Sequence, residues 1–335
     1  MKLLIVTQVV DENHTNLSFF LRWIEEFAKH CEQVHVICLE KGEHTLPNNV
    51  KIHSLGKEKS QGKIVYLFNF YKLIFGLRKE YDNVFVHMNQ IYTILGSTVW
   101  HIMKKKVGLW YTHGSVPKSL VVAEKFVDVI FSASPESFRL ESKKLFVTGH
   151  GIDTQKISPK TVEKDIDLVT VGRITESKNL IELINILKAV RNDHKVSLTV
   201  VGGVVTEEEV TYQTKLTQHV KELGLEEEVV FLGMQSREKV SDILNRSKVF
   251  VTVAQNGSLD KAILEALATG LPVVSMAPGT KSLMLGDSQV EDSEAFITQL
   301  NTVIESSVYM REANVAFVRK NHSIESLIPK ILNSY

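Results

Sequence analysis

The stretch VTVGRITESKN, residues 169–179, joins an apolar run to the start of an amphipathic segment. The run 166–171 has the length of a buried strand, whereas 179–191 has the length and apolar spacing of a helix. A second strand-like run, 196–201, follows that helix. Strand, helix and strand in this order predict a parallel sheet covered by helices.

The same alternation extends outward through most of the chain. A linker without apolar periodicity, SPKTVEK at 158–164, interrupts it once. We therefore predict an α/β protein with two Rossmann-like, doubly wound domains, 1–160 and 161–310, that face each other across a cleft. Ligands of such sheets bind at the carboxyl ends of the strands, so we expect the functional residues there.

Composition excludes several classes of protein. Of the 335 residues, 44% are hydrophobic and 23% charged, as in an ordinary folded chain. The 39 basic side chains balance the 39 acidic ones, and this zero net charge disfavours a nucleic-acid partner. The charges are unevenly distributed, because residues 1–160 hold 21 basic and only 15 acidic side chains. Cys31 and Cys38 lack metal-ligand spacing, and we expect a reduced, cytoplasmic protein. No apolar run reaches the roughly 20 residues of a spanning helix.

Two cations follow the strand of the opening stretch. The strand ends at Gly172, and Arg173 and Lys178 come directly after it. An arginine fork matches phosphate oxygens and a lysine supplies a mobile point charge, so the pair suits a departing diphosphate. The alternative is an ordinary solvated loop before a helix. After the next strand, the pair Gly202 and Gly203 is suited to close approach of a ligand.

A second informative segment is NGSLDKAILEALATGLPVV, residues 256–274. A loop containing Gly257 opens a helix predicted over 260–269, and its first backbone N–H groups can bind phosphate. Ser258 and Asp260 are alternatively only helix N-caps. Glu265, farther along the helix, has a carboxylate that can accept from the two hydroxyls of a ribose.

Three features occur in order along the chain: the motif GR-x4-K, this loop, and the motif LEA-x-A-x-G-LPVV. In this order of motifs the chain resembles the retaining glycosyltransferases of family 4, which have the GT-B fold. HGID at 150–153 and THGSV at 112–116 extend the resemblance over nearly the whole chain. It implies transfer of a hexose from a nucleotide-diphosphate sugar, most often a uridine diphosphate sugar, to a hydroxyl acceptor in cell-envelope polysaccharide or glycolipid synthesis. It also implies an acceptor-binding first domain, a donor-binding second domain and a C-terminal helix, 311–335, that returns to the first.

The resemblance assigns roles to individual positions, with protein cations rather than a metal facing the diphosphate. The catalytic candidates are His113, Arg173, Lys178 and Asp260. The donor-binding candidates are Gly172, Gly203, Gly257, Ser258, Leu259, Lys261, Glu265, Gly233 and Met234, with base contacts from the backbone near 232–235. The acceptor-side candidates are His87, Asn89 and Asn16, and a capped turn is an equally good interpretation of the segment 85–92 that contains the first two. For His113 the alternative is a merely structural histidine after a strand.

The chain departs from the family pattern at one acidic position. Gly257 stands where the first Glu of the usual Glu-x7-Glu pair would fall, and we expect the nearby Asp260 to take over its contacts to sugar hydroxyls. Two alternatives stay open, and the missing carboxylate is an argument for the second. One is a nucleotide-sugar epimerase of the same fold, and the other is a nucleotide-sugar binding protein without catalysis.

The first half also contains a basic and apolar region. It includes KIVYLFNFYKLIFGLRK at 63–79 and MKKK at 103–106. Such a composition suits peripheral contact with an anionic membrane at its inner face. The alternative is a core helix whose basic residues reach out to solvent.

Overall fold

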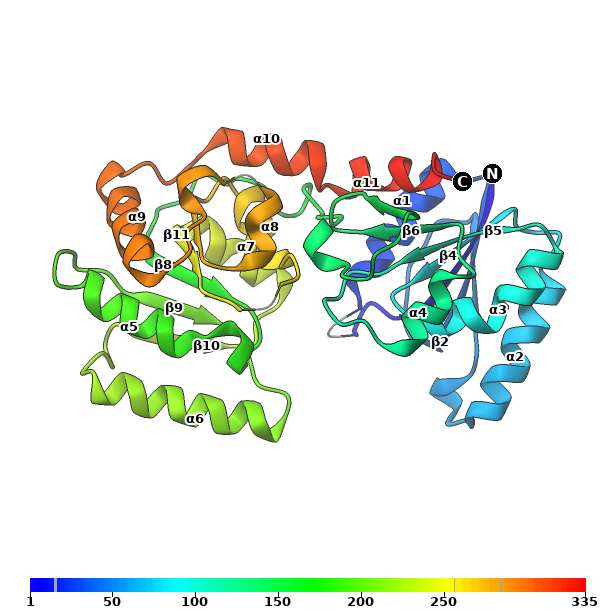
Figure 1. Ribbon diagram of the computed structural model, residues 1–335, viewed down its shortest axis with the longest axis horizontal. Coiled ribbons are helices and arrows are strands. Elements are labelled where there is room, and N and C mark those ends of the chain that lie inside the picture. The colour runs from blue at the N-terminus through cyan, green and yellow to red at the C-terminus, as the bar shows by residue number, and fades with distance from the viewer. Residues whose placement is uncertain (15–16, 256, 284) are drawn as a thin grey trace. The chain divides into compact units, whose positions relative to one another are not determined.

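The computed structural model, shown in Figure 1, describes residues 1–14, 17–255, 257–283 and 285–335. They form two compact units, Met1–Gly151 with Ile324–Tyr335, and Ile152–Ser323. The boundaries between these units lie at residues 151 and 323, whereas the sequence predicted domain boundaries at 160 and 310. In the second unit, Ile152 pairs with Ser323 in a parallel β-bridge, and its N–H donates to the His322 carbonyl at 2.6 Å.

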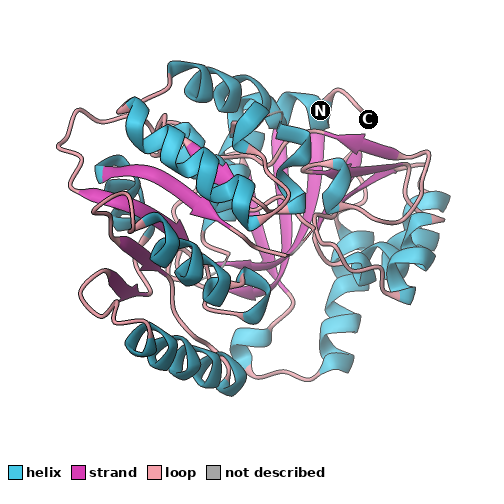
Figure 2. Ribbon diagram, turned by 60° about the vertical axis from the view of Figure 1, so that its left-hand side comes forward, coloured by secondary structure: helices cyan, strands magenta, loops and turns pink. Residues whose placement is uncertain are grey.

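The first unit contains a seven-stranded parallel sheet with helices on both faces, as Figure 2 shows. Its strands are β1 (Lys2–Val10), β2 (Gln33–Lys41), β3 (Val50–Ser54), β4 (Asn83–His87), β5 (Lys106–Trp110), β6 (Val129–Ser132) and β7 (Leu145–Val147). Its helices are α1 (Phe19–His30), α2 (Lys63–Gly76), α3 (Gln90–Ile102), α4 (Lys118–Glu124) and α11 (Ile324–Leu332). The strand order β3-β2-β1-β4-β5-β6-β7 reverses its direction of growth between β1 and β4.

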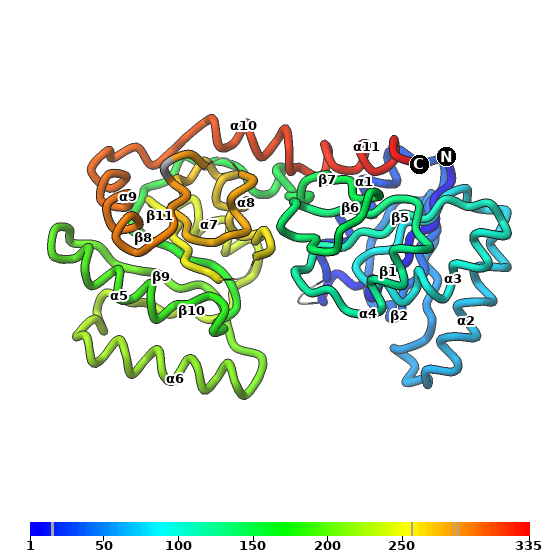
Figure 3. The backbone as a smooth tube through the Cα atoms, in the orientation of Figure 1, coloured from blue at the N-terminus to red at the C-terminus, as the bar shows by residue number. Residues whose placement is uncertain are grey.

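Alternation along the strands places two apolar layers on the two faces of this sheet. Leu3 and Ile5 of β1 pack with α1 and α11, whereas Leu4 and Val6 pack with α2, α3 and α4. The tube in Figure 3 follows the chain back to the first unit at its end. There Arg22 of α1 pairs with Glu325 of α11 at 2.8 Å, which supplements the apolar contacts of α11.

The second unit contains a five-stranded parallel sheet in the order β10-β9-β8-β11-β12. Its strands are β8 (Ile166–Val171), β9 (Leu198–Val201), β10 (Val229–Gly233), β11 (Ser247–Thr252) and β12 (Val273–Ser275). Its helices are α5 (Leu180–Val190), α6 (Glu207–Glu222), α7 (Arg237–Arg246), α8 (Lys261–Ala268), α9 (Ser293–Ser306) and α10 (Glu312–Asn321).

One face of this second sheet packs against α5, α6 and α9, and the other against α7, α8 and α10. The strand order reverses between β8 and β11, so a crevice opens at the carboxyl ends of these two strands. The prediction of two parallel, doubly wound α/β sheets is therefore confirmed. The opening stretch and the second motif lie directly after the two strands that frame the crevice.

Candidate active site

The carboxyl ends of β8 and β9 are built from glycines in close contact. A Cβ atom at Gly202, where φ is +153°, would lie 1.8 Å from the carbonyl oxygen of Gly172. A Cβ at Gly172, where φ is +151°, would lie 2.8 Å from the Lys178 ammonium nitrogen. Only glycine fits both positions, because a side chain would collide there and the backbone angles disfavour L-residues. The backbone at this sheet edge is thus left uncovered except by Lys178.

An ion pair joins the two segments that frame the crevice. Lys178 ends the short 3-10 helix Glu176–Lys178 after β8, and Asp260 is the N-cap of α8 after β11. Their charged groups are in contact although the residues are 82 positions apart, and their side chains are only 16% and 22% exposed. The Gln255 N–H also donates to the Ser177 carbonyl at 2.8 Å, which ties the same two loops together.

Arg173 pairs with a carboxylate that the sequence analysis did not identify. Its guanidinium contacts Glu209, which is buried at the start of α6. Glu209 closes a capping box with Thr206 and also accepts the Val205 N–H at 2.6 Å. Burial by itself would raise the pKa of Glu209, but the Val205 N–H and the Arg173 guanidinium outweigh it and the pKa lies below its ordinary value.

Each of the two predicted diphosphate cations is therefore held by a carboxylate. The Arg173 side chain remains 56% exposed, so its guanidinium is open to an incoming anion on one side. A diphosphate that enters the crevice competes with Glu209 and Asp260 for these two cations. Such an exchange of one anion for another would keep both cations paired in the free and the bound state.

A second charged group lies along α8. Lys261 and Glu265 are one helical turn apart and half-buried, and Arg237, the first residue of α7, interacts electrostatically with both. Burial, reinforced by Arg237, lowers the pKa of Lys261 to about 7, while Glu265 acts in the opposite direction. Burial raises the pKa of Glu265 despite the two neighbouring cations.

The loop before α8 supplies backbone rather than side chains. A Cβ at Gly279 would lie 2.3 Å from the Ser258 carbonyl oxygen, so this loop packs tightly against the segment after β12. Leu259 is buried in the core, while Gly257 and Ser258 are half-buried. The structure therefore leaves Leu259 a role through its main chain only.

The remaining donor-binding candidates lie after β9 and β10. The Gly202 N–H donates to the carbonyl of Gly233 at 3.0 Å, and a Cβ at Gly203 would lie 3.2 Å from the Met234 Cβ. Met234 is 56% exposed. These residues continue the same sheet edge from the ion pairs toward the edge strand β10.

In the first unit, His113 lies exposed in the loop after β5. Its Nδ1 accepts the Ser115 N–H at 3.1 Å and contacts the Ser115 hydroxyl at 2.8 Å. A neutral ring that accepts at Nδ1 carries its proton on Nε2, so the exposed side of the ring is a hydrogen-bond donor.

The acceptor-side candidates have structural partners. His87 is 2% exposed, its Nδ1 lies 3.3 Å from the Thr7 hydroxyl, and its ring stacks on Phe20 with centroids 3.9 Å apart. Asn89 is the N-cap of α3 and accepts the Ile91 N–H at 3.1 Å. The structural interpretations of His87 and Asn89 thus describe what the structure contains. Asn16 lies outside the described residues.

Two family models match the chain, one in each unit. The model described as "Glycosyl transferase 4-like" matches residues 5–120, and the one described as "Glycosyl transferases group 1" matches residues 152–317. The chain belongs to the group 1 glycosyltransferases. The family resemblance predicted from the sequence is confirmed.

Solved structures with the same fold span the whole chain of this glycosyltransferase. HepE of Anabaena in complex with UDP has a TM-score of 0.79 at 17% identity, covering 100% of this chain and 99% of that one. The lipopolysaccharide outer core galactosyltransferase WaaB has a TM-score of 0.70 at 15% identity, with the same coverage of 100% and 99%. The predicted GT-B fold is confirmed.

Curated relatives of this glycosyltransferase match over shorter segments. The mannosylfructose-phosphate synthase of Agrobacterium fabrum is 30% identical over 110 residues, which are 32% of this chain and 24% of the relative. The N-acetylgalactosamine-N,N'-diacetylbacillosaminyl-diphospho-undecaprenol 4-alpha-N-acetylgalactosaminyltransferase of Campylobacter jejuni is 25% identical over 181 residues, covering 51% of this chain and 47% of the relative. The chain thus spans less than half the length of these two relatives.

Two site residues of this glycosyltransferase escaped the sequence analysis. Glu209 follows Thr206 by three positions, which is the spacing of a capping box and the signal that could have located it. Arg237 begins a helix directly after a strand, at the same sheet edge as the site. Neither spacing reveals the cation or carboxylate that each residue meets, because those partners come from other elements.

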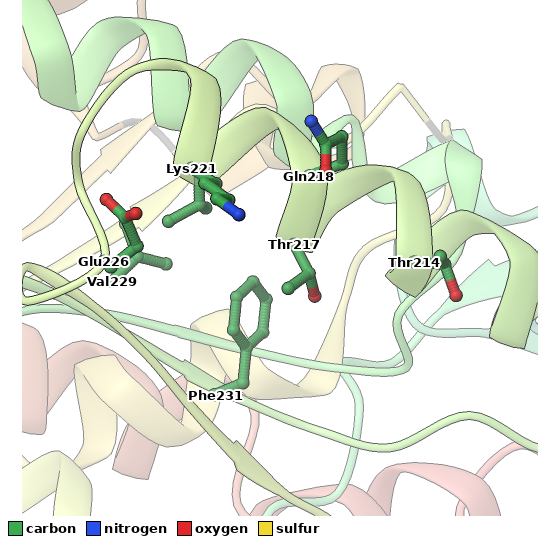
Figure 4. Close-up of a pocket in the computed structure, with 8 residues that line it drawn as sticks. Thr214, Thr217, Gln218, Lys221, Glu226, Val229 and Phe231 are labelled. Atoms are coloured by element: carbon green, nitrogen blue, oxygen red, sulfur yellow. The ribbon is translucent and has the colours of Figure 1, made fainter.

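A groove elsewhere in the second unit is separate from these residues. It has a volume of about 340 Å³ between α6 and β10, and Figure 4 shows Phe231 pointing toward it beneath Thr217 and Lys221. None of the predicted site residues lines it. Over the described ranges, no cluster of three or more His, Cys, Asp or Glu side chains is arranged to hold a metal ion.

Proposed function

We propose that the protein transfers a hexose from a uridine diphosphate sugar to a hydroxyl acceptor, with retention at the anomeric carbon, in the synthesis of a cell-envelope glycan. The observation that carries the proposal is the pair of Lys178 and Asp260 at the strand-order reversal of a unit that matches the family. HepE binds UDP in its structure, and two further relatives are named for colanic acid and amylovoran biosynthesis. These names support the donor and the pathway class.

The leaving group is the centre of the proposed mechanism. When the bond to the anomeric carbon breaks, the departing diphosphate gains negative charge. Arg173 and Lys178 would stabilise that charge more in the transition state than in the ground state, which raises turnover and not only affinity. The first N–H groups of α8 would add a fixed positive potential at the same place.

Glu209 and Asp260 would give up their cations as the donor binds. Because Glu209 also accepts two backbone N–H groups of the capping box, it stays solvated by the protein after Arg173 turns to the phosphate. Asp260 has the Ala262 N–H at 3.3 Å and would then be oriented toward a sugar hydroxyl. In this proposal Asp260 replaces the carboxylate that is missing at Gly257.

Glu265 would hold the ribose, and its setting supports that role. A carboxylate beside Lys261 and Arg237 is oriented by cations on both sides, and its raised pKa reflects a poorly hydrated site. A ribose diol supplies two donors to such a carboxylate. Gly233 and Met234 would line the base, where main-chain groups do the recognition.

The first unit would contribute His113 and the acceptor. The exposed Nε2–H of His113 can donate to a sugar hydroxyl near the reacting carbon, a role that no apolar residue could supply. We place the acceptor in the first unit, without assigning it to His87, whose ring is buried.

A nucleotide-sugar binding protein without catalysis is the second candidate. It is favoured by Gly257, because the carboxylate expected there contacts the donor sugar in the family pattern. A binding protein needs the diphosphate cations but no acceptor site. The two functions therefore predict the same ligand and differ only in turnover.

A thermal-shift panel of nucleoside diphosphates and nucleotide sugars, each with and without EDTA, tests the proposal. A ligand that binds only the folded protein must raise its melting temperature. We expect one diphosphate to do so, with the shift retained in EDTA and lost in Arg173→Ala and Lys178→Ala. Lys215→Ala, an exposed lysine on α6, is the matched control.

Incubation of the stabilising nucleotide sugar with envelope acceptors then separates the two candidates. Release of the nucleoside diphosphate that depends on acceptor supports the transferase. Binding without release, over a broad acceptor screen, supports the binding protein. Absence of any thermal shift contradicts both.

A further inference from the structure

The helix α2 exposes apolar side chains that a soluble surface would normally bury. Ile64 is 84% exposed, Phe68 67% and Phe75 48%, while only Phe70 and Ile74 of the helix are buried. The alternative predicted from the sequence, a core helix, holds for one face of α2 only, through Phe70 and Ile74. Figures 1 and 3 show α2 at the outside of the first unit, next to α3.

The exposed residues form one stripe. Positions 64, 68 and 75 fall on the same side of a helix with 3.6 residues per turn, whereas Phe70 and Ile74 lie about 120° farther around the helix axis, toward the sheet. Val65 and Leu67, 38% and 41% exposed, widen the stripe. Contiguous apolar surface of this kind marks an interaction site.

Basic residues border the same helix. Between 57 and 79 the chain has six Lys or Arg and a single acidic residue, Glu58. Lys63, Lys72 and Lys79 are exposed and form no ion pair within the described part of the chain. Glu58 accepts from the Ser54 hydroxyl at 2.7 Å, and Lys57 pairs with Glu40 at 2.7 Å. The other basic residues give the surroundings of the stripe a net positive charge.

We propose that this α2 surface, the apolar stripe Ile64, Val65, Leu67, Phe68 and Phe75 with Lys63, Lys72 and Lys79, binds the interface of an anionic lipid bilayer. The helix has 14 residues, about 21 Å at 1.5 Å per residue, so it lies in the interface rather than crossing the bilayer. Over the described ranges, no helix is both long and apolar enough to cross a membrane.

The charges favour a bilayer over a second copy of the chain. In a two-fold dimer the same surface meets itself, which would bring Lys72 and its neighbours toward their own counterparts. An anionic lipid surface instead attracts each of these lysines. The apolar stripe then inserts among the acyl chains, which bury the two large exposed side chains Ile64 and Phe68.

Co-sedimentation of the full chain with vesicles tests the proposal. We expect binding to phosphatidylcholine vesicles that contain phosphatidylglycerol and at least about tenfold weaker binding to phosphatidylcholine alone, with the difference reduced at high salt. The variant Ile64→Ser with Phe68→Ser should lose about tenfold or more in affinity, because both side chains would be buried in the bilayer. Lys72→Gln with Lys79→Gln should weaken binding and reduce its salt dependence.

The control is Val205→Ser with Val210→Ser, two valines of the second unit that are 66% and 52% exposed. This variant should bind vesicles as the wild type does. All substituted side chains are exposed, so the variants should fold, which a melting curve in the absence of lipid verifies.

A Phe68→Trp variant reports insertion directly. The three native tryptophans are buried, so a blue shift of the emission on adding anionic vesicles would come from position 68. Three results would overturn the proposal: no vesicle binding by the wild type, unchanged binding by the Ile64→Ser, Phe68→Ser variant, or a wild-type dimer in sedimentation velocity that this variant converts to monomer. Vesicle binding, tryptophan emission and sedimentation are all measured without glycosyl transfer. A failure of the proposed function and a failure of the membrane proposal can therefore be told apart.

Discussion

The two sheets reverse their strand order in the same way, but the two reversal points differ in chemistry. At β8 and β11 the chain has glycines, two ion pairs and half-buried charged side chains. At β1 and β4 the described residues include the buried His87, which stacks on Phe20 with Trp23 close by. The side chains of Glu12 and Asn13 after β1 are exposed. Topology thus creates a crevice in each unit, and the residues after the strands decide whether it is kept open for a ligand or filled by packing.

The difference also extends to the backbone. In the second unit, glycines occupy the left-handed angles at the strand ends, and the resulting open main chain can approach a phosphate. In the first unit, the corresponding left-handed residue after β4 is Met88, with φ +63°. A side chain with such angles costs energy, which the packing around it must offset. Side chains therefore shape the crevice of the first unit, whereas glycines leave main-chain groups open at the crevice of the second unit.

The largest expected effect comes from the open crevice. Lys178→Ala should lower kcat of the transferase by about 100-fold to 1000-fold, as loss of one preorganised positive group does. The substitution also leaves Asp260 unpaired beside the diphosphate. Initial rates of nucleoside diphosphate release measure this effect, with Lys215→Ala as the control. A kcat equal to that of the wild type would remove Lys178 from the mechanism.

The next effect concerns a histidine pair in the first unit. Burial lowers the pKa of His35 to about 4, and His53, 3.0 Å away, and Lys51 act in the same direction while Glu80 opposes them. The unfolded chain binds this proton near pH 6.5, so it holds more protons than the folded chain between about pH 6.5 and 4. Stability therefore falls as the pH drops through this window, by about 3 kcal/mol in total.

Urea unfolding followed by tryptophan emission measures that loss. Trp23, Trp100 and Trp110 all belong to the first unit, so the signal reports on it selectively. In His35→Gln, which cannot titrate, the stability of the first unit should depend much less on pH between 6.5 and 4. An equally steep dependence in this variant would assign the effect to other groups.

A smaller effect compares two histidines of the first unit. His87→Ala removes a buried ring and should cost roughly 2 kcal/mol of stability. His113→Ala removes an exposed ring and should change stability by less than about 0.5 kcal/mol. Transfer rates should show the reverse order once the fraction of folded protein is taken into account. A greater loss of specific activity in His87→Ala would show that the filled crevice has a direct role.

The smallest expected effect concerns the charge of Lys261, on the helix that begins at the crevice of the second unit. Because the pKa of Lys261 lies at about 7, its positive charge is lost as the pH rises from 6 to 8. Affinity for the nucleotide sugar should therefore fall by about threefold to tenfold over this range, since the diphosphate favours the protonated lysine. Titration calorimetry of wild type and Lys261→Arg tests this. The arginine keeps its charge, and its affinity should stay nearly constant with pH.

The sequence alone determined the fold class and the positions of the candidate donor-site residues along the chain. Apolar periodicity is a local property, so 166–171, 179–191 and 196–201 predicted β8, α5 and β9 closely. The motifs GR-x4-K and LEA-x-A-x-G-LPVV, which contain Arg173, Lys178 and Glu265, are each local and carried the family resemblance. These features depend on neighbours in the chain, which a sequence displays directly.

Tertiary structure alone decided which partner each of these residues meets. Arg173 with Glu209 and Lys178 with Asp260 are separated by 36 and 82 positions, and only the order of the strands brings them together. The local patterns left open whether His87 faces a ligand and whether Phe68 lies in the core, and the tertiary structure buries the first and exposes the second. Burial depends on which distant elements cover a side chain, and no local pattern of residues contains that information.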